Sequence, residues 1–210
     1  MSATVATKPP TAAEITSQEE FKNLLLELLP NQGCWSEDRY LGLTDHTSRY
    51  IEFTDGYIDV LPMPTNRHQV LLRFVFLAFN AFISPLGGTV LFAPIRLRIR
   101  ADKFREPDLI LLRSAQDPRR ENRYWKGADL TLEVVSEDKP ERDIVDKVHD
   151  YAEAGVPEYW IVNPQTETIT VLRLDGTAYV EHGVFGRGKT ATSALLPGFS
   201  VEVNAVMDAD

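Results

Sequence analysis

Residues 106–112 read EPDLILL and residues 130–136 read LTLEVVS, and these two stretches decide the fold. Each contains a predominantly apolar run, at 109–112 and 130–135, with a carboxylate directly before the first run and another inside the second. Predominantly apolar runs of this length are typical of strands that are covered on both faces. We therefore place both runs at the centre of a sheet that has helical layers on its two sides.

The carboxylates of these two runs are the first candidate site. Asp108 follows Pro107 at the start of one run, and Glu133 lies inside the other. Ionised carboxylates in such places are costly unless they are paired or bind a metal. If the strands are antiparallel neighbours, the two side chains meet at one edge of the sheet, where Mg²⁺ or Mn²⁺ would hold them together. The alternative is that Asp108 caps a turn and that Glu133 pairs with an arginine such as Arg96 or Arg98.

A lysine is the next candidate, on the helix that the pattern of residues 143–154 predicts after the second run. The apolar side of this amphipathic pattern consists of Ile144, Val148, Tyr151 and Ala152. Asp143, Lys147 and Tyr151 recur every four residues and therefore share one stripe. Lys147 would polarise or orient a water if this stripe faces the carboxylates. The alternative is an exposed acid–base pair worth about 0.3–0.5 kcal/mol.

The remaining segments complete an α/β pattern. Residues 49–62 alternate as two strands around Asp55-Gly56, which is a strong hairpin signal. Thr65-Asn66 is typical of a helix N-cap and predicts a helix to about Ser84. Further strands are predicted at 90–100, 159–162 and 168–174, and a short helix at 17–29. We expect a mobile lead-in over 1–16 and one domain over 17–210, with a mixed, mostly antiparallel sheet flanked by helices.

Charge is distributed unevenly along the chain. The net charge of −9 argues against tight, sequence-independent binding of nucleic acid. Residues 96–126 nevertheless carry ten basic against five acidic side chains. In the predicted strand at 90–100, apolar residues alternate with Arg96, Arg98 and Arg100, which predicts a cationic face for a nucleic-acid backbone. The alternative is a solvated edge strand.

Composition limits the other classes of function. The 210 residues are 43% hydrophobic and 25% charged, as in soluble domains. A single cysteine excludes a disulfide framework and suggests a reducing, cytoplasmic location. The most apolar stretch, 70–83, is interrupted by Arg73 and Asn80 and is shorter than the ~20 residues that span a bilayer, so we expect a core helix and no membrane partner. His46, His149 and His182 lack the spacing of zinc ligands.

The ordered motifs resemble a known family. EPDLILL, LTLEVVS and RDIVDKVHDYAEAGVPEYWIVNP (142–164) are similar to the Uma-two family of restriction-type endonucleases, in the PD-(D/E)XK nuclease superfamily. TDGYIDVLPMPTNRHQVLL (54–72) resembles the family's Asp-Gly hairpin, which precedes a histidine at the start of a long helix. The resemblance covers about residues 51–164.

The resemblance implies a restriction-endonuclease-like core and a set of site residues. Asp108 and Glu133 would be the catalytic, metal-binding carboxylates, with the carbonyl group of Val134 as a further ligand of Mg²⁺ or Mn²⁺. The superfamily's lysine would stand at Val135, and Lys147 on the following helix is its replacement. His68 matches the family's histidine and is expected at the edge of the site, with a purely structural role as the alternative. Apart from the resemblance, Asp143 is expected there from its place on the stripe with Lys147, and Glu52 either adds a carboxylate to the site or only decorates a strand.

These inferences predict an endonuclease that hydrolyses phosphodiester bonds of DNA with Mg²⁺ or Mn²⁺. Cleavage of both strands would favour a homodimer, because one domain reaches one strand most easily. Two alternatives remain open at this point. One is a catalytically silent protein of nuclease fold that binds nucleic acid or a protein. The other is a homo-oligomeric interaction module without a nucleic-acid role.

Overall fold

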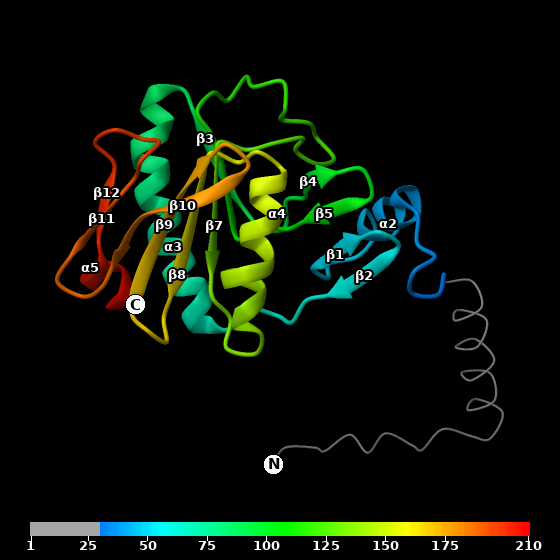
Figure 1. The fold of residues 1–210 in the computed structure, drawn as a ribbon, viewed down its shortest axis with the longest axis horizontal. Coiled ribbons are helices and arrows are strands. Elements are labelled where there is room, and N and C mark those ends of the chain that lie inside the picture. The colour runs from blue at the N-terminus through cyan, green and yellow to red at the C-terminus, as the bar shows by residue number, and fades with distance from the viewer. Residues whose placement is uncertain (1–29) are drawn as a thin grey trace, which may run out of the picture.

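The computed structural model describes residues 30–210, so the predicted lead-in and the helix predicted at 17–29 lie outside the described residues. The described helices are α2 (Glu37–Thr44), α3 (Asn66–Ile83), the 3-10 turn η1 (Ser84–Leu86), the π-helical turn η2 (Arg142–Asp146), α4 (Lys147–Glu153) and α5 (Val203–Met207). Helices α3 and α4 lie on opposite sides of the largest sheet, and a smaller sheet stands beside them (Figure 1).

The largest sheet has six strands in the order β10-β9-β8-β7-β6-β3. Its strands are β3 (Thr89–Phe92), β6 (Leu109–Leu112), β7 (Leu130–Val134), β8 (Glu158–Asn163), β9 (Thr168–Asp175) and β10 (Ala178–Phe185). Strands β7 and β8 are parallel and are linked through α4, while all other neighbours are antiparallel. This arrangement confirms the predicted mixed, mostly antiparallel sheet with helices on both faces.

The apolar runs correspond to the central strands β6 and β7, which are buried along their whole length. Successive side chains of a strand point to opposite faces, and both faces of this sheet are covered. Leu132 and Val134 of β7 pack in the cluster on the α3 side. Glu133 therefore faces the α4 side. Because Leu109 is opposite Leu132 in the antiparallel pair β6–β7, the next step of the register brings Asp108 beside Glu133, as predicted.

The smaller sheet has the order β2-β1-β5-β4 and packs against α2. Its strands are β1 (Ile51–Thr54), β2 (Tyr57–Val60), β4 (Leu97–Arg100) and β5 (Lys103–Arg105), and a third, two-stranded sheet joins β11 (Thr190–Thr192) to β12 (Ser200–Glu202). Asp55 and Gly56 both have positive φ at the turn between β1 and β2, which confirms the predicted hairpin. From this hairpin, Oε1 of Glu52 accepts a hydrogen bond from the N–H of Glu106 at 3.3 Å, shortly before β6 begins.

The segment 90–100 is not one strand, contrary to our prediction. Its first part is β3 at the edge of the six-stranded sheet, and its last part is β4 at the edge of the smaller sheet. Pro94 lies between them and has no N–H to continue a ladder of hydrogen bonds. The arginines of this segment therefore belong to the smaller sheet or to the link that precedes it.

Helix α3 begins after Thr65, whose hydroxyl accepts a hydrogen bond from the N–H of His68 at 3.2 Å, as the predicted N-cap requires. Its apolar face, including Val75 and Phe79, is buried against the sheet. By length and composition alone, residues 66–86 would suffice to cross a membrane, a property that core helices share. The cap places His68 in the first turn, at the end of the helix that is nearest the carboxylates.

The helix predicted at 143–154 is present but begins as the π-helical turn η2 before it continues as α4. Our prediction that Ile144 lies on the buried face is wrong, because its side chain is 43% exposed. The buried side of this segment instead carries the charged stripe of Asp143, Lys147 and Tyr151 together with Asp150. A π turn changes the phase of a helix, and the ion pairs described below hold the charged stripe inward.

Candidate active site

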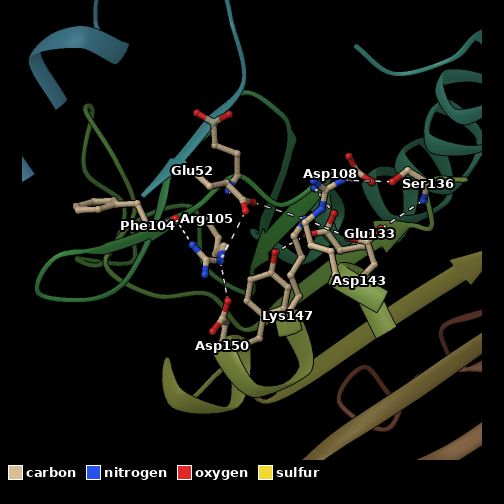
Figure 2. Close-up of polar contacts among 12 residues, drawn as sticks. Glu52, Phe104, Arg105, Asp108, Glu133, Ser136, Asp143, Lys147 and Asp150 are labelled. Carbon is tan, nitrogen blue, oxygen red and sulfur yellow. Dashed lines mark hydrogen bonds and ion pairs between the residues drawn. The ribbon is translucent and has the colours of Figure 1, made fainter. Parts of the chain in front are cut away.

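Lys147 stands among three carboxylates that come from three different elements. Its Nζ atom is 2.8 Å from Oε1 of Glu133, 3.3 Å from Oδ1 of Asp143 and 3.7 Å from Oε1 of Glu52. All four side chains are buried, and Figure 2 shows them converging from β1, β7 and the η2–α4 segment. The predicted lysine stripe therefore does face the carboxylates. The partner of Glu133 is Lys147, and not Arg96 or Arg98.

Asp108 lies directly beside this cluster, at the start of β6. Its Oδ2 atom accepts a hydrogen bond from the main-chain N–H of Val134 at 2.8 Å. Its Oδ1 atom is 3.1 Å from Nε2 of His68, and its own N–H donates to Oε2 of Glu133 at 3.4 Å. The structure thus brings together the two predicted carboxylates, the lysine and the histidine. It also brings Glu52 and Asp143, both predicted at the site's edge, into contact with Lys147.

Burial and charge shape the proton affinities of the cluster. Burial raises the pKa of Glu133 well above its usual range, although the charge of Lys147 acts in the opposite direction. Burial likewise raises the pKa of Asp143. Burial works against the charged form of Lys147, but the charges of Glu133 and Glu52 outweigh it and raise the pKa of the ammonium group. The site therefore holds more carboxylates than its single ammonium can neutralise.

Asp108 and His68 behave as a separate pair. Burial acts to raise the pKa of Asp108, but the hydrogen bond and charge of His68 prevail and lower it. Burial acts to lower the pKa of His68, but the hydrogen bond that its imidazole donates to Asp108 and the charge of Asp108 overcome this effect and raise it. The contact between His68 and Asp108 therefore favours the ionised form of the carboxylate and the protonated form of the imidazole. The result is an ionised carboxylate beside Glu133.

The donor set fits a hard divalent cation. Asp108 and Glu133 offer oxygen atoms, and the excess of buried negative charge favours a cation between them. The N–H and C=O groups of one strand residue point to the same side, so the carbonyl group of Val134 faces Asp108 as its N–H does. Within residues 30–210, no three Asp, Glu, His or Cys side chains are arranged to hold a metal alone. Mg²⁺ commonly takes one or two carboxylates and completes its shell with water and substrate phosphate.

A cleft of about 500 Å³ gives access to these groups. Its lining includes the predicted site residues Asp108, Glu133, Val134, Lys147, His68 and Asp143. Tyr50, Met63 and Phe92 contribute an aromatic and apolar part of the lining, and Arg67 and Arg142 contribute positive charge. The carboxylate cluster can therefore be reached by a ligand of the size of a nucleotide unit.

A second layer of polar contacts holds the cluster in place. The hydroxyl of Tyr151 donates a hydrogen bond to Oε1 of Glu133. Arg105 lies between Glu52, at 3.7 Å, and Asp150, at 2.6 Å, so it joins the smaller sheet to α4 (Figure 2). The sequence indicated Tyr151 only as a member of the stripe and gave no sign of Arg105 or Asp150. These partners come from segments that are far apart in the chain.

Glu106 is a cleft residue to which sequence reasoning assigned no role. Its side chain is buried, and its Oε2 atom accepts a hydrogen bond from the N–H of Ile51 at 3.2 Å. Burial and the nearby charge of Glu52 raise the pKa of Glu106 to about 8. The available signal was its position two residues before Asp108 in the stretch EPDLILL. Glu106 is thus a neutral acid at the wall of the cleft near pH 7.

This property predicts a pH-dependent stability. In the unfolded chain a glutamate loses its proton near pH 4.5, and in the folded protein Glu106 does so near pH 8. The folded protein therefore holds the extra proton between these values, and the free energy of unfolding contributed by Glu106 falls as the pH rises through this window. In Glu106→Gln this decline is expected to disappear. Thermal melting in EDTA at pH 5 and pH 8.5 measures the difference, and equal declines in both proteins would contradict the prediction.

The arginines predicted to bind nucleic acid lie elsewhere. Arg96 donates to Oδ1 of Asp45 at 2.9 Å, and Arg98 donates to Oε2 of Glu37 at 3.1 Å. Arg100 pairs with both Asp55 and Glu153. Neither these partners nor the arginines line the cleft. Binding of a nucleic-acid backbone by this segment remains a prediction, and it would require phosphate to compete with a carboxylate at each position.

The mixed sheet with a carboxylate–lysine cluster at its edge defines a protein of nuclease fold. A crystal structure described as that of "a putative nuclease belonging to DUF820" from Anabaena variabilis ATCC 29413 superposes with a TM-score of 0.68. The match has 19% sequence identity and covers 85% of this chain and 98% of the other. The sequence profile of the Uma2 family, described as "Putative restriction endonuclease", matches residues 37–204, and the chain belongs to this family. No curated protein matches the sequence.

Proposed function

We propose that this protein is a divalent-metal endonuclease that hydrolyses phosphodiester bonds, with DNA as its substrate. The observation that supports the proposal is the meeting of Asp108, Glu133 and Lys147 at the floor of an accessible cleft. Asp108 and Glu133 would hold Mg²⁺ or Mn²⁺, with the carbonyl group of Val134 as a further ligand. The bound metal would neutralise charge on the phosphate and lower the pKa of the attacking water.

The protein's own side chains would orient the attacking water, stabilise the phosphate and fix the two carboxylates. Lys147 is an ammonium that donates hydrogen bonds, so it would orient the attacking water and offset the charge that develops on the phosphate. Tyr151 fixes one oxygen of Glu133, and His68 fixes one oxygen of Asp108. Such partners limit the rotation of both carboxylates and keep them preorganised for binding.

Position 135, where the superfamily's lysine would stand, is occupied by valine. This substitution agrees with the role proposed for Lys147. Val135 is buried in the apolar cluster beneath α4. The ammonium group of Lys147 reaches Glu133 from the facing helix, and so supplies the positive charge from a different element. This geometry supports the enzyme, because the ammonium group lies beside the carboxylates that would bind the metal, where it can reach the attacking water.

Cleavage of supercoiled plasmid and of linear duplex DNA tests the proposal. Nicked and linear products are expected with MgCl₂ or MnCl₂ and are not expected in EDTA. Attack by water with the superfamily's chemistry would leave 5′-phosphate ends, which DNA ligase can rejoin. We also propose a homodimer, since double-strand cleavage needs two sites. DNA binding without cleavage under all metal conditions would favour the silent protein instead, and the lack of both would favour an interaction module.

A further inference from the structure

The cleft contains positive charges of different kinds. Four side chains that line it can carry such charge: Arg67, His68, Arg142 and Lys147. His68 is paired with Asp108, and Lys147 is paired with Glu133. Arg67 donates to main-chain carbonyl groups near the end of the chain. Each of these three side chains therefore already has a hydrogen-bond acceptor within the protein.

Arg142, the first residue of η2, is bonded differently. Its Nη2 group donates to the hydroxyl of Ser136 at 3.3 Å, which is long for a hydrogen bond. Its Nε atom is buried and has no hydrogen-bond partner among residues 30–210. Arg142 is close enough to Asp138 and Asp143 for its charge to favour their ionised forms, but it forms no ion pair with any carboxylate of the described residues. Its charge is therefore not neutralised by contact.

The unused side of this guanidinium has the geometry of an anion receptor. Nε and Nη2 form one fork of parallel donors, which matches two oxygen atoms of a phosphate or a carboxylate. One arm of the fork holds a weak neutral acceptor, and the other holds none. Buried N–H groups without acceptors are rare in folded proteins, and a functional ligand is one reason for them. A ligand with two acceptor oxygens would satisfy both arms.

The proposed activity identifies the ligand. The lining of the cleft is acidic, because Asp108, Glu133 and Asp143 contribute to it. A carboxylate ligand would meet the same repulsion as a phosphate, but only a phosphodiester is the substrate of the proposed nuclease. We propose that Arg142 and Ser136 form a phosphate subsite at the cleft, which binds a phosphodiester group of the substrate strand. This inference rests on the proposed function and adds two residues, Arg142 and Ser136, to which the resemblance assigns no role.

The subsite explains how an acidic site tolerates a polyanion. Arg142 directly precedes Asp143, which contacts Lys147, so the subsite lies one residue away from the cluster in the chain. Its uncompensated charge offsets part of the repulsion between the strand and the carboxylates. The arginines of β4 cannot do this from their present positions, because they are paired and lie outside the cleft.

Binding measurements on the full chain test the subsite. We would titrate a fluorescein-labelled 30-mer duplex with protein in CaCl₂, which replaces MgCl₂ to suppress cleavage, between 50 and 200 mM NaCl. The variants are Arg142→Met, which retains the apolar stem, Arg142→Lys, which retains the charge, and Arg173→Met as the matched control. Arg173 is half exposed on β9 and does not line the cleft. Thermal melting of each variant checks folding.

Arg142→Met is expected to weaken binding by roughly tenfold to a hundredfold and to reduce the slope of log Kd against log salt by about one. Arg142→Lys should restore the slope but only part of the affinity, because an ammonium lacks the fork. Arg173→Met should match the wild type. Equal affinity and slope in Arg142→Met and Arg173→Met would overturn the subsite while leaving the proposed nuclease intact.

The two proposals can fail separately. If the wild type binds the duplex, loses affinity in Arg142→Met and yet cuts no DNA with Mg²⁺ or Mn²⁺, the phosphate subsite stands and the proposed hydrolysis is wrong. If the wild type neither binds nor cuts the duplex, both proposals are wrong. Cleavage at the wild-type rate by Arg142→Met at limiting substrate would contradict the subsite alone.

Discussion

Asp108→Asn is expected to lower the rate of DNA cleavage by roughly a thousandfold, because several kcal/mol of charge stabilisation are lost with the metal. Asparagine has nearly the shape of aspartate, and its carbonyl oxygen can still accept the hydrogen bond from the N–H of Val134. The fold should therefore survive. The expected result is a folded protein that does not bind Mn²⁺ at the concentrations at which the wild type does.

Two measurements establish this result. Plasmid nicking gives the rate, and isothermal titration with MnCl₂ gives the affinity of the metal. Asp175→Asn is the matched control, since Asp175 is exposed at the end of β9 and lies outside the cleft. It should cut and bind Mn²⁺ as the wild type does. Undiminished Mn²⁺ binding by Asp108→Asn would show that the carboxylate of Asp108 does not hold the metal.

Lys147→Met is expected to have the largest effect on stability. The substitution leaves Glu133 and Asp143 buried without their ammonium partner, and removal of one member of a buried ion pair costs about 3–5 kcal/mol. Urea unfolding in EDTA at pH 7.5 measures this loss. Cleavage should be lost as well, because the proposed mechanism uses the same ammonium group to position the attacking water.

The physical cause of the loss can be separated from a packing defect. Burial already raises the pKa of Glu133 and Asp143 above their usual range, and the loss of Lys147 raises both further. Folded carboxyl groups with raised pKa bind protons that the unfolded chain releases, so their contribution to stability falls as the pH rises. Lys147→Met should therefore recover stability as the pH is lowered from 7.5 toward 5, and it should recover part of it when combined with Glu133→Gln.

Metal provides a third distinction for the same variant. A bound cation would replace part of the missing positive charge, so MgCl₂ should raise the melting temperature of Lys147→Met more than that of the wild type. A variant that is as stable as the wild type in EDTA would show that Lys147 does not neutralise the cluster. A variant that is unstable at every pH and metal concentration would indicate a packing defect only.

Local patterns predicted a large part of the fold. The hairpin at Asp55-Gly56, the start of α3 after Thr65 and the central strands β6 and β7 depend on residues that are neighbours in the chain, so their patterns are readable. The antiparallel register that brings Asp108 beside Glu133 follows from the same two strands. Pro94 is a possible strand break in the sequence. The regular alternation around it nevertheless favoured a single strand, although β3 and β4 belong to different sheets.

Long-range partners were not predictable in this way. Arg96 is paired with Asp45 of the α2 end, and Arg98 with Glu37, about fifty to sixty positions away. An alternating basic strand has the same sequence whether its arginines face solvent, phosphate or carboxylates. Long-range partners also explain why Ile144 is exposed. The charged stripe of its helix faces ion-pair partners on other elements, so Ile144 lies on the solvent side.

The sequence by itself determined that carboxylates lie in buried strands and that a lysine lies on the next helix with a stripe of the right spacing. These are properties of hydrophobic periodicity, which acts over a few residues. Only the tertiary structure decided which charges neutralise one another: Lys147 with Glu133, His68 with Asp108, and Arg142 with no carboxylate. The energy of a buried charge depends on the distance to every neighbour, and those neighbours come from segments that meet only in the folded chain.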